Sequence, residues 1–381
     1  MSEARAPLPN TPIGPAGAQE VADQAELGGR MQDDVLIVGA GPTGLTAAVE
    51  LARRGSVPRV IERREALSPL SRAVGLLPQS MRILAASGAA DGIRAEAVVL
   101  RRAIFHRGAD RVGAVPLDPG DGRRLLALPQ DRTEAHLLAA FERLGGTVEF
   151  GRTFETLEQD ADGVTALIDG HETRVARLLG ADGVQSAVRR ALGLPFRGIT
   201  LDGDWSIADV DSPDWPAPDD FMVFLLDGGD ACIVVPLAPD RYRVIATGPD
   251  ALAMLPVPMT IARLRRAGTF RIMVRQVPEY GRGLVHLAGD AAHVHSPVGG
   301  RGMNLGIADA ADWAARLSGG RLEGYSAARL AAGRATIRQS EFGRATLLTD
   351  GARRRAALAV MALAGRVPAL GRILAGRILS M

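Results

Sequence analysis

Short apolar runs that end in glycine or in a carboxylate mark the first part of the chain. Residues 35–38, Val-Leu-Ile-Val, form a continuous apolar run, which is typical of a strand buried on both faces. A glycine-rich turn follows, then a helical pattern over 45–54 that Gly55 ends, and then a short strand over 58–61 that runs into Glu62. Strand, turn, helix and strand in this order predict one complete βαβ unit.

The later segments extend this unit and then change character. Helical patterns lie at 79–90 and 131–145, and strand-like runs lie at 103–105, 125–128, 148–153, 154–159, 164–168, 175–180, 221–226, 231–236, 242–247 and 283–288. The runs within 148–168 suggest a small antiparallel set, and those within 221–247 are joined by hairpin turn patterns. Most of the chain after Asn304 is helical. We therefore expect a parallel α/β layer, contributed by distant segments, that an antiparallel sheet interrupts.

Composition narrows the chemistry. The chain has 381 residues, 47% hydrophobic and 23% charged, which fits one large domain or two cooperating ones and excludes disorder over the whole length. All 45 basic residues are arginine, so a mechanism that needs a lysine amine is excluded. The single cysteine, Cys232, excludes an internal disulfide, a cysteine-rich metal site and a dithiol redox pair. No basic block is interleaved with aromatic residues, which argues against a nucleic-acid partner.

The first chemical motif is Gly39-x-Gly41-x-x-Gly44, directly after the first strand. Glycines at a strand end let the backbone approach a pyrophosphate, and the following helix offers free N–H groups and the positive end of its dipole. Glu62 lies 21 residues beyond Gly41, at the end of the second strand, where its carboxylate can accept hydrogen bonds from a ribose. Together these features predict dinucleotide binding, but they leave FAD and NAD both open.

Two later motifs repeat the same device. Asp182 lies in Leu-Gly-Ala-Asp-Gly after one buried strand, and Asp290 lies in Gly-Asp-Ala-Ala-His after another. The second of these runs on into a glycine-rich loop over 299–304 and a long helix. An acid at a strand end can bind sugar-like hydroxyls, and a glycine-rich loop at a helix N-terminus can hold an anionic heterocycle. Three separated sites of this kind fit one elongated ligand with a ribose, a pyrophosphate, a ribityl chain and a ring, which is FAD.

In this order and spacing, the three motifs resemble those of the class A FAD-dependent aromatic hydroxylases of the para-hydroxybenzoate hydroxylase type, over roughly residues 33–345. The third motif is most similar to that of hydroxylases that modify aromatic polyketides and large phenols and that do not carry a C-terminal thioredoxin-like domain. The resemblance implies an α/β fold. It would have a Rossmann-like FAD-binding domain, of the para-hydroxybenzoate hydroxylase or glutathione reductase type, with an inserted antiparallel β-sheet substrate domain and C-terminal helices.

The resemblance also implies a division of the chain. We expect a disordered lead at 1–32, FAD-binding parts at 33–100, 131–200 and 279–345, substrate-domain segments at 101–130 and 201–278, and C-terminal helices at 346–381. The lead lacks the apolar core of a signal peptide, so we expect a cytoplasmic protein. We also expect it to be a monomer or a homodimer. Arginines alternate with apolar residues over 353–381, but Pro368 breaks this pattern, so we expect the segment to fold onto the protein and not onto a membrane.

Residue roles follow from the same resemblance. The expected FAD-binding residues are Gly39, Gly41, Pro42, Thr43, Gly44, Glu62, Arg63, Arg72, Gln130, Asp182, Gly183, Gly289, Asp290, Pro297, Gly300, Gly302, Met303 and Asn304, and no metal ligands are expected. Arg72 and Gln130 would lie near the phosphates or the ribityl chain, and Asp290 would bind ribityl hydroxyls. Pro297 and the loop over 299–304 would line the isoalloxazine.

Three residues beside the ring are the catalytic candidates: His295, Pro297 and Arg301. His295 could deprotonate a phenol, although a structural role is an equal alternative, whereas His293 is expected to serve the loop structure. The family's usual Gly-Gln-Gly carries Arg301 at its centre here, so we expect a positive charge near the flavin. The segment over 249–269 also looks short for the family.

The implied activity is hydroxylation of an aromatic substrate, for which a polycyclic phenol is a candidate. NAD(P)H would reduce FAD, dioxygen would add at flavin C4a to give a hydroperoxide, and its terminal oxygen would pass to the ring in a dry pocket. Two alternatives stay open: a flavin oxidoreductase of the same fold that performs epoxidation, oxidative decarboxylation or reduction, and a catalytically idle flavin-binding or ligand-binding protein. Lysine-dependent amine oxidases and halogenases are excluded, as are disulfide reductases, which need paired cysteines.

Overall fold

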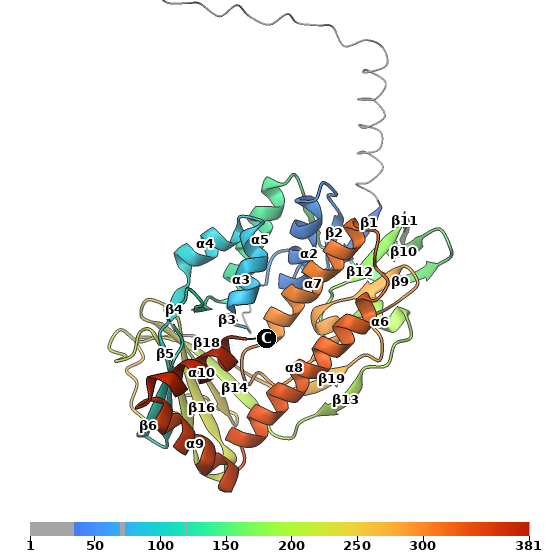
Figure 1. Cartoon of the computed structure of the whole chain (residues 1–381). Coiled ribbons are helices and arrows are strands. Elements are labelled where there is room, and N and C mark those ends of the chain that lie inside the picture. The colour runs from blue at the N-terminus through green and yellow to red at the C-terminus, as the bar shows by residue number, and fades with distance from the viewer. Residues whose placement is uncertain (1–33, 69–72, 119, 381) are drawn as a thin grey trace, which may run out of the picture.

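The computed structural model describes residues 34–68, 73–118 and 120–380 of the chain (Figure 1). The expected lead over 1–32 and the phosphate-site candidate Arg72 lie outside these residues. Within the described part, the strands form two large β-sheets and three small ones, with helices between them in the chain.

A six-stranded sheet carries the three motifs, and its strands come from four distant parts of the chain. Its order is β20 (Gly281–Arg282), β21 (Val285–Leu287), β12 (Arg177–Gly180), β1 (Val35–Val38), β2 (Arg59–Glu62) and β8 (Val148–Phe150). Neighbours are parallel except β20 and β21. The predicted parallel layer is confirmed, and all four residues of β1 are buried, as a continuous apolar run predicts.

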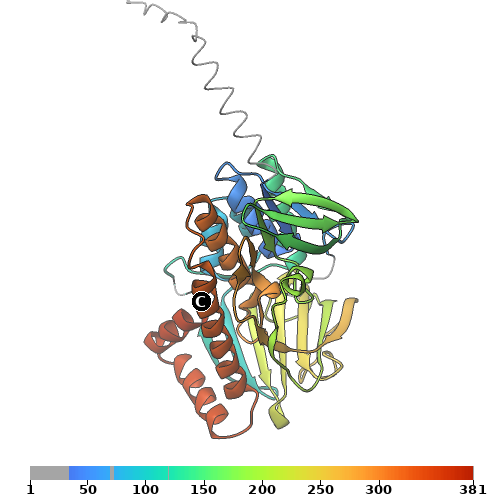
Figure 2. The ribbon, with the colours of Figure 1, turned by 90° about the vertical axis from the view of Figure 1, so that its right-hand side faces the viewer.

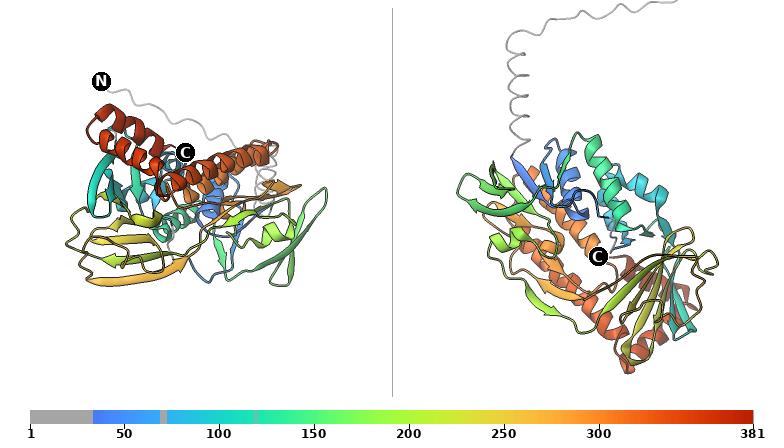
Figure 3. Two further views of the ribbon diagram at one scale, coloured as in Figure 1. Left: turned by 90° about the horizontal axis from the view of Figure 1, so that it is seen from below. Right: turned by 180° about the vertical axis from the view of Figure 1, so that it is seen from behind.

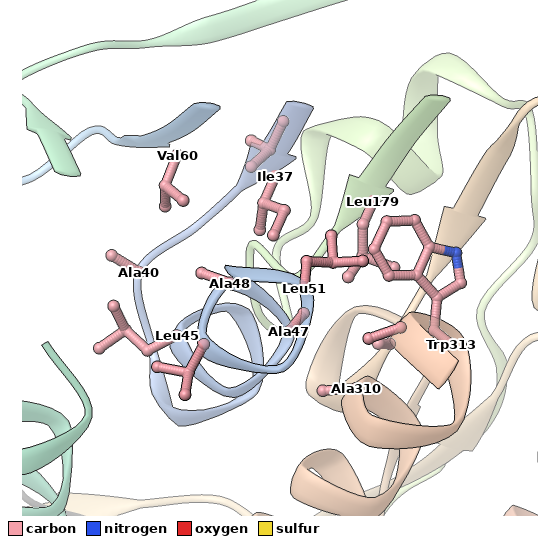
Figure 4. Packing of buried hydrophobic residues seen from close by; sticks show 14 of the residues in the cluster. Ile37, Ala40, Leu45, Ala47, Ala48, Leu51, Val60, Leu179, Ala310 and Trp313 are labelled. Carbon is pink, nitrogen blue, oxygen red and sulfur yellow. The ribbon is translucent and has the colours of Figure 1, made fainter. Parts of the chain in front are cut away.

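Small residues let the helices come close to this sheet and to each other. The central helices are α2 (Pro42–Ala52), α5 (Gln130–Arg143) and α7 (Gly302–Ser318). Figure 4 shows Ala47 and Leu51 of α2 facing Trp313 of α7, with Leu179 of β12 beside them; all four are buried. This packing fixes α2 against the sheet and against α7, and the first motif lies at the start of α2.

The second large sheet has seven strands. Its order is β18 (Arg263–Phe270), β14 (Trp205–Asp211), β17 (Arg241–Thr247), β16 (Ala231–Ala238), β15 (Asp220–Leu225), β5 (Arg102–Arg107) and β6 (Asp110–Pro116). All neighbours are antiparallel except β15 and β5. The predicted antiparallel sheet is confirmed, but three of its strands, β6, β14 and β18, were not predicted. The edge strand β18 is exposed and rich in arginine, so it lacks the apolar alternation that indicates a strand.

The two faces of this sheet bury different clusters. Val223 and Leu225 of β15 pack with Leu358 and Ala375 from two C-terminal helices. Met222 on the opposite face packs in a cluster that includes apolar residues of 251–259. The segment over 249–269 therefore covers one face of the sheet and then begins the edge strand.

The C-terminal helices are α8 (Tyr325–Leu347), α9 (Ala352–Ala364) and α10 (Pro368–Leu379) (Figures 2 and 3). Pro368 starts α10 and ends the helical pattern before it, as predicted. Both α9 and α10 fold back on the seven-stranded sheet. No single helix in the described ranges is long and apolar enough to cross a membrane; α9 and α10 meet that criterion only as a pair, bent by 120°.

The remaining elements correct two predictions. The small sheets are β11-β10-β9 (His171–Val175, Val164–Ile168, Phe154–Gln159), β13-β19-β22 (Arg197–Thr200, Met273–Gln276, His293–Val294) and β3-β7-β4 (Gly75–Leu76, Leu125–Ala127, Val98–Leu100). The run at 148–153 was assigned wrongly to the antiparallel set, because 148–150 is β8 of the parallel sheet. The single helix predicted over 79–90 is two helices, α3 (Pro78–Ala85) and α4 (Ala89–Glu96), since Gly88 at φ +74° turns the chain between them.

Candidate functional site

The glycines of the first motif allow three backbone segments to meet. Gly39 has φ +105°, and a Cβ on it would lie 2.5 Å from the carbonyl oxygen of Ala181 in the second motif. A Cβ on Gly44 would lie 1.9 Å from the carbonyl oxygen of Gly39. A Cβ on Gly41, by contrast, would meet no atom within 4 Å. Two of the three glycines are thus required by the fold, and Gly41 borders open space at the start of α2.

The N-terminus of α2 is suited to an anion. Pro42 occupies the first turn, and Gly41 at the N-cap has no side chain that could cap the helix. The N–H groups of Thr43 and Gly44 precede the first bond of the helix, from Leu45 N–H to the Gly41 carbonyl, and have no partner within the helix. The open space beside Gly41 can therefore hold a pyrophosphate on free N–H groups and the helix dipole.

Glu62 stands beside this turn at the end of β2 and is 6% exposed. Its Oε2 accepts a hydrogen bond from Ala40 N–H at 2.9 Å, and its Oε1 accepts from the backbone N–H of Arg64 at 3.0 Å and from Arg64 Nε at 2.9 Å. Burial raises the pKa of Glu62, but the bonds from Arg64 and Ala40 outweigh burial and lower it. The carboxylate is thus ionised and held in place. Arg64 is the arginine that pairs with it, while the predicted Arg63 is exposed.

Gln130 joins two segments at the start of α5. Its Oε1 accepts from Ala73 N–H at 3.2 Å, and its Nε2 donates to Glu134 Oε1 at 2.8 Å. Glu134 is 1% exposed, and its Oε2 has no hydrogen-bond partner in the described part of the chain. Burial raises the pKa of Glu134. This buried carboxyl was missed in the sequence, where it is one more polar residue of an amphipathic helix.

Asp182 holds the second motif to the helix that follows it. Its Oδ2 accepts from the N–H groups of Ala187 at 2.7 Å and Val188 at 3.1 Å, at the start of α6 (Ala187–Ala191). Its Oδ1 is buried and has no partner among the described residues, and burial raises the pKa of Asp182. Gly183 follows at φ +79°. Asp182 therefore has a structural role and one carboxylate oxygen left for a ligand.

The third motif meets the first at Thr43. A Cβ on Gly289 would lie 2.4 Å from Thr43 Oγ1, and a Cβ on Gly306 of α7 would lie 2.3 Å from the same atom. Gly289 has φ +61° and opens the short turn Gly289–Ala291 after β21. Asp290 lies exposed in that turn. All three motifs are thus assembled around the first turn of α2.

Asp309 of α7 connects the parts of the third motif. It is 0% exposed; its Oδ2 accepts from Gly289 N–H at 3.0 Å and contacts His293 Nε2 at 2.6 Å, and its Oδ1 accepts from Arg329 Nε at 2.6 Å. Burial raises the pKa of Asp309, but the contacts with His293 and Arg329 outweigh it and lower it. His293 thus has the expected structural role. Asp309 was missed, and an acid inside an otherwise apolar helical stretch was the pattern that could have revealed it.

Asn304 fixes the far end of the glycine-rich loop. Its Oδ1 accepts from Leu77 N–H at 2.8 Å, and its Nδ2 donates to the carbonyl oxygens of Gly75 at 2.8 Å and Gly300 at 2.9 Å. Asn304 is fully buried, and the neighbouring Met303 is 9% exposed. Asn304 therefore ties the loop to β3, and its contact with the ring stays a prediction.

The three catalytic candidates have different surroundings. Pro297 is exposed, and its carbonyl oxygen accepts from Gly300 N–H at 2.8 Å, which closes a tight turn in the loop. His295 Nδ1 lies 2.9 Å from the Ser296 carbonyl oxygen, and its buried Nε2 has no partner among the described residues. That nitrogen lies 4.0 Å from the position of a Cβ on Gly302, at the start of α7. Burial lowers the pKa of His295 to about 4, so the ring is neutral at pH 7.

Arg301 is buried, and its guanidinium bonds to backbone carbonyls of α10. Burial lowers its pKa, although an arginine remains charged.

FAD fits the residues that are present. The space beside Gly41 and the free N–H groups of α2 suit the pyrophosphate, and the second oxygen of Asp182 remains available to a polar group of the ligand. Glu62 is an ionised acceptor at the expected ribose position. Among the described residues, no cluster of three or more His, Cys, Asp or Glu side chains could hold a metal ion.

Comparison with known proteins supports this cofactor. The sequence profile of a family described as FAD binding domain matches residues 32–254 and 251–340. The chain is 36% identical over 313 residues to 12-dehydrotetracycline 5-monooxygenase/anhydrotetracycline 6-monooxygenase of Streptomyces rimosus. That match covers 74% of this chain and 61% of the relative. The chain thus spans less than two thirds of the length of such curated relatives.

Solved structures agree. Anhydrotetracycline hydroxylase OxyS of Streptomyces rimosus superposes with a TM-score of 0.72 at 32% identity, over 91% of this chain and 75% of the other. The p-nitrophenol 4-monooxygenase of Pseudomonas putida superposes with a TM-score of 0.82 over 91% of this chain and 98% of the other; at 24% identity it shows the fold alone. The chain therefore belongs to the FAD binding domain family, and its resemblance to the FAD-dependent aromatic hydroxylases is confirmed.

Proposed function

We propose that the protein is an FAD-dependent monooxygenase that uses NAD(P)H and dioxygen to hydroxylate an aromatic, polycyclic phenolic substrate. The observation that carries this proposal is the assembly of all three motifs around the first turn of α2, with Gly39 against Ala181 and Thr43 against Gly289. The similarity to relatives that are named as dehydrotetracycline and anhydrotetracycline monooxygenases supports the polycyclic substrate.

The protein's own residues would divide the work. FAD, when bound, supplies the redox chemistry and the activation of dioxygen. The N-terminus of α2 binds the pyrophosphate, Glu62 and Asp290 bind the sugar-like hydroxyls, and the loop tied down by Asn304 orients the ring. Arg63 and Arg72 stay proposed contacts of the phosphate side, together with Gln130.

His295 would accept a hydrogen bond from the substrate hydroxyl and orient it, but would be a weak base toward its proton. Its Nδ1–H, assigned from the 2.9 Å contact with the Ser296 carbonyl, leaves Nε2 as an acceptor. Since the pKa of His295 is about 4, Nε2 accepts a hydrogen bond at pH 7 but holds a proton poorly. The substrate itself would lie beside the apolar cluster of the seven-stranded sheet that carries Val223, because this cluster continues to Ala127 next to β3, to which the loop over 299–304 is tied. Apolar surroundings there would keep water from the reaction.

An anaerobic titration of the FAD-loaded protein tests this function. The visible flavin spectrum is followed while NADPH, and separately NADH, is added with and without polycyclic and single-ring phenols. We expect bleaching that a polycyclic phenol accelerates, and a product one oxygen heavier after air is admitted. Bleaching with an unoxygenated product would favour another flavin reaction, no bleaching would favour an idle flavoprotein, and a protein without flavin would refute the proposal.

A further inference from the structure

Arg301 is a buried cation whose partners are backbone carbonyls. Arg301 is 5% exposed. Among the described residues, it forms no ion pair with a carboxylate. Nη1 donates to the carbonyl oxygen of Ser380 at 2.5 Å, and Nη2 donates to that of Arg377 at 3.2 Å. Because a buried charge is costly unless its N–H groups find acceptors, these two bonds are what make the position tolerable.

Both carbonyls belong to the last turn of α10. Arg377 lies in that turn, and Ser380 is the C-cap residue. At this end of a helix the carbonyls have no N–H partner within the helix, and the dipole is negative. Arg301 supplies both the N–H donors and the positive charge, although it lies 76 positions before Arg377 and 79 positions before Ser380 in the chain. The contact therefore anchors the end of α10.

The loop that carries Arg301 is the one expected to line the flavin ring. Asn304 ties one side of it to β3, through Leu77 and Gly75. A Cβ on Gly299 would lie 3.1 Å from Arg301 Nε, so the side chain runs back along its own loop before it reaches α10. Figures 1 and 3 show the end of α10 beside the start of α7, between the two large sheets.

The other contacts of α10 place it on the substrate side. Ala375 is buried in the cluster that contains Val223 and Leu225. The same helix thus contacts the face of the seven-stranded sheet proposed for the substrate and, through Arg301, the loop proposed for the ring. A fixed C-terminal end of α10 therefore covers the place where the seven-stranded sheet meets the loop over 299–304.

We propose that Arg301 is a positioning residue, which holds the last turn of α10 against the loop over 299–304 and so excludes water from the substrate side of the flavin. The inference rests on the proposed function. It replaces the expectation that Arg301 serves as a charge beside the flavin, because the N–H groups of the guanidinium are directed at the helix.

The test compares two ways of breaking this contact. Arg301→Gln removes the donor side, and a chain ending at Gly376 removes both acceptors but keeps Arg301. Arg301→Lys keeps the charge without the planar fork, and Arg372→Gln, at an exposed arginine of the same helix, is the matched control. Amide hydrogen exchange of 368–376, the flavin midpoint potential, and the share of NAD(P)H electrons recovered as hydrogen peroxide with substrate present are measured on the FAD-loaded chains.

We expect Arg301→Gln to accelerate exchange in 368–376 by about tenfold, with Arg301→Lys in between and Arg372→Gln unchanged. The truncated chain should release as much peroxide as Arg301→Gln, and combining the two should add nothing further. Wild-type exchange in Arg301→Gln would overturn the proposal. So would a change of flavin potential in Arg301→Gln if the truncated chain kept both the wild-type potential and the wild-type peroxide share. If no FAD binds, the proposed function fails, while exchange in the flavin-free chains still decides whether Arg301 holds α10.

Discussion

Two buried carboxylates, one in each large sheet region, are connected in different ways. The Asp309 carboxylate forms hydrogen bonds with Gly289 of a turn, His293 of a short strand and Arg329 of another helix. Asp209 in β14 accepts two hydrogen bonds from Arg243 of the neighbouring strand β17, from Nε at 2.7 Å and from Nη2 at 2.8 Å. Both carboxylates are shielded from water, and among their side-chain partners Arg329 alone is partly exposed, at 13% of its side chain.

Asp309 therefore connects distant segments of the site, whereas Asp209 stabilises two adjacent strands. Asp309 positions Gly289, and Gly289 packs on Thr43, so the carboxylate connects the third motif to the first. Asp209 fixes a cross-strand register that the β14–β17 ladder also fixes. Equal burial therefore predicts similar costs in stability but different costs in cofactor binding.

The largest expected effects come from Asp309→Asn and Asp209→Asn. Asp209→Asn leaves the buried guanidinium of Arg243 facing a neutral amide. Asp309→Asn neutralises a fully buried carboxylate that three groups share. We therefore expect each variant to lower the free energy of unfolding by roughly 3–5 kcal/mol. Urea unfolding of both variants, with FAD affinity measured by flavin fluorescence, checks this. Asp309→Asn should lose FAD even where it is folded, whereas folded Asp209→Asn should bind it normally. Equal loss of FAD in both variants would contradict the comparison.

The sequence allowed more of the FAD-binding part to be predicted than of the seven-stranded sheet. The motif glycines have a backbone requirement, such as φ +105° at Gly39, which restricts the residue type and so is visible in the sequence. The strands β6 and β18 have no such restriction: β18 is an exposed edge in which five of the eight residues lack apolar side chains. The partners of Arg301 could not be predicted either, because backbone carbonyls of α10 leave no trace in residue identity.

The glycines of the first motif offer a sharper version of the comparison within one turn. Gly44→Ala places a Cβ 1.9 Å from a carbonyl oxygen, so we expect it to lower the free energy of unfolding by about 3 kcal/mol and to abolish FAD binding. Gly41→Ala adds a Cβ to open space at φ −78°, so it should unfold like wild type and lose FAD affinity alone. Thermal unfolding of the flavin-free chains, followed by FAD titration, separates the two effects. Undiminished FAD affinity in Gly41→Ala would place the pyrophosphate elsewhere.

The smallest expected effect concerns two histidines whose pKa burial lowers to about 4, the half-buried His295 beside the loop and the buried His286 in β21. Since the unfolded value is near 6.5, the unfolded chain binds more protons than the folded one between pH 4 and 6.5. The stability that each neutral ring contributes is complete above pH 6.5 and declines as the pH falls toward 4. From pH 7.5 to pH 5 the decline is about 2 kcal/mol for each histidine.

His295→Gln and His286→Phe should therefore each remove about 2 kcal/mol from the acid-induced loss of stability, measured as the difference in urea unfolding between pH 7.5 and pH 5. Product formation at pH 7.5 then distinguishes them. Only His295→Gln should slow it, because Nε2 of His295 faces the start of α7, while the His286 ring packs edge-on against Tyr325 at 5.6 Å, inside the core. A His295→Gln chain that hydroxylates at the wild-type rate would restrict His295 to the structural role that its contacts with Ser296 and Ser340 already give it.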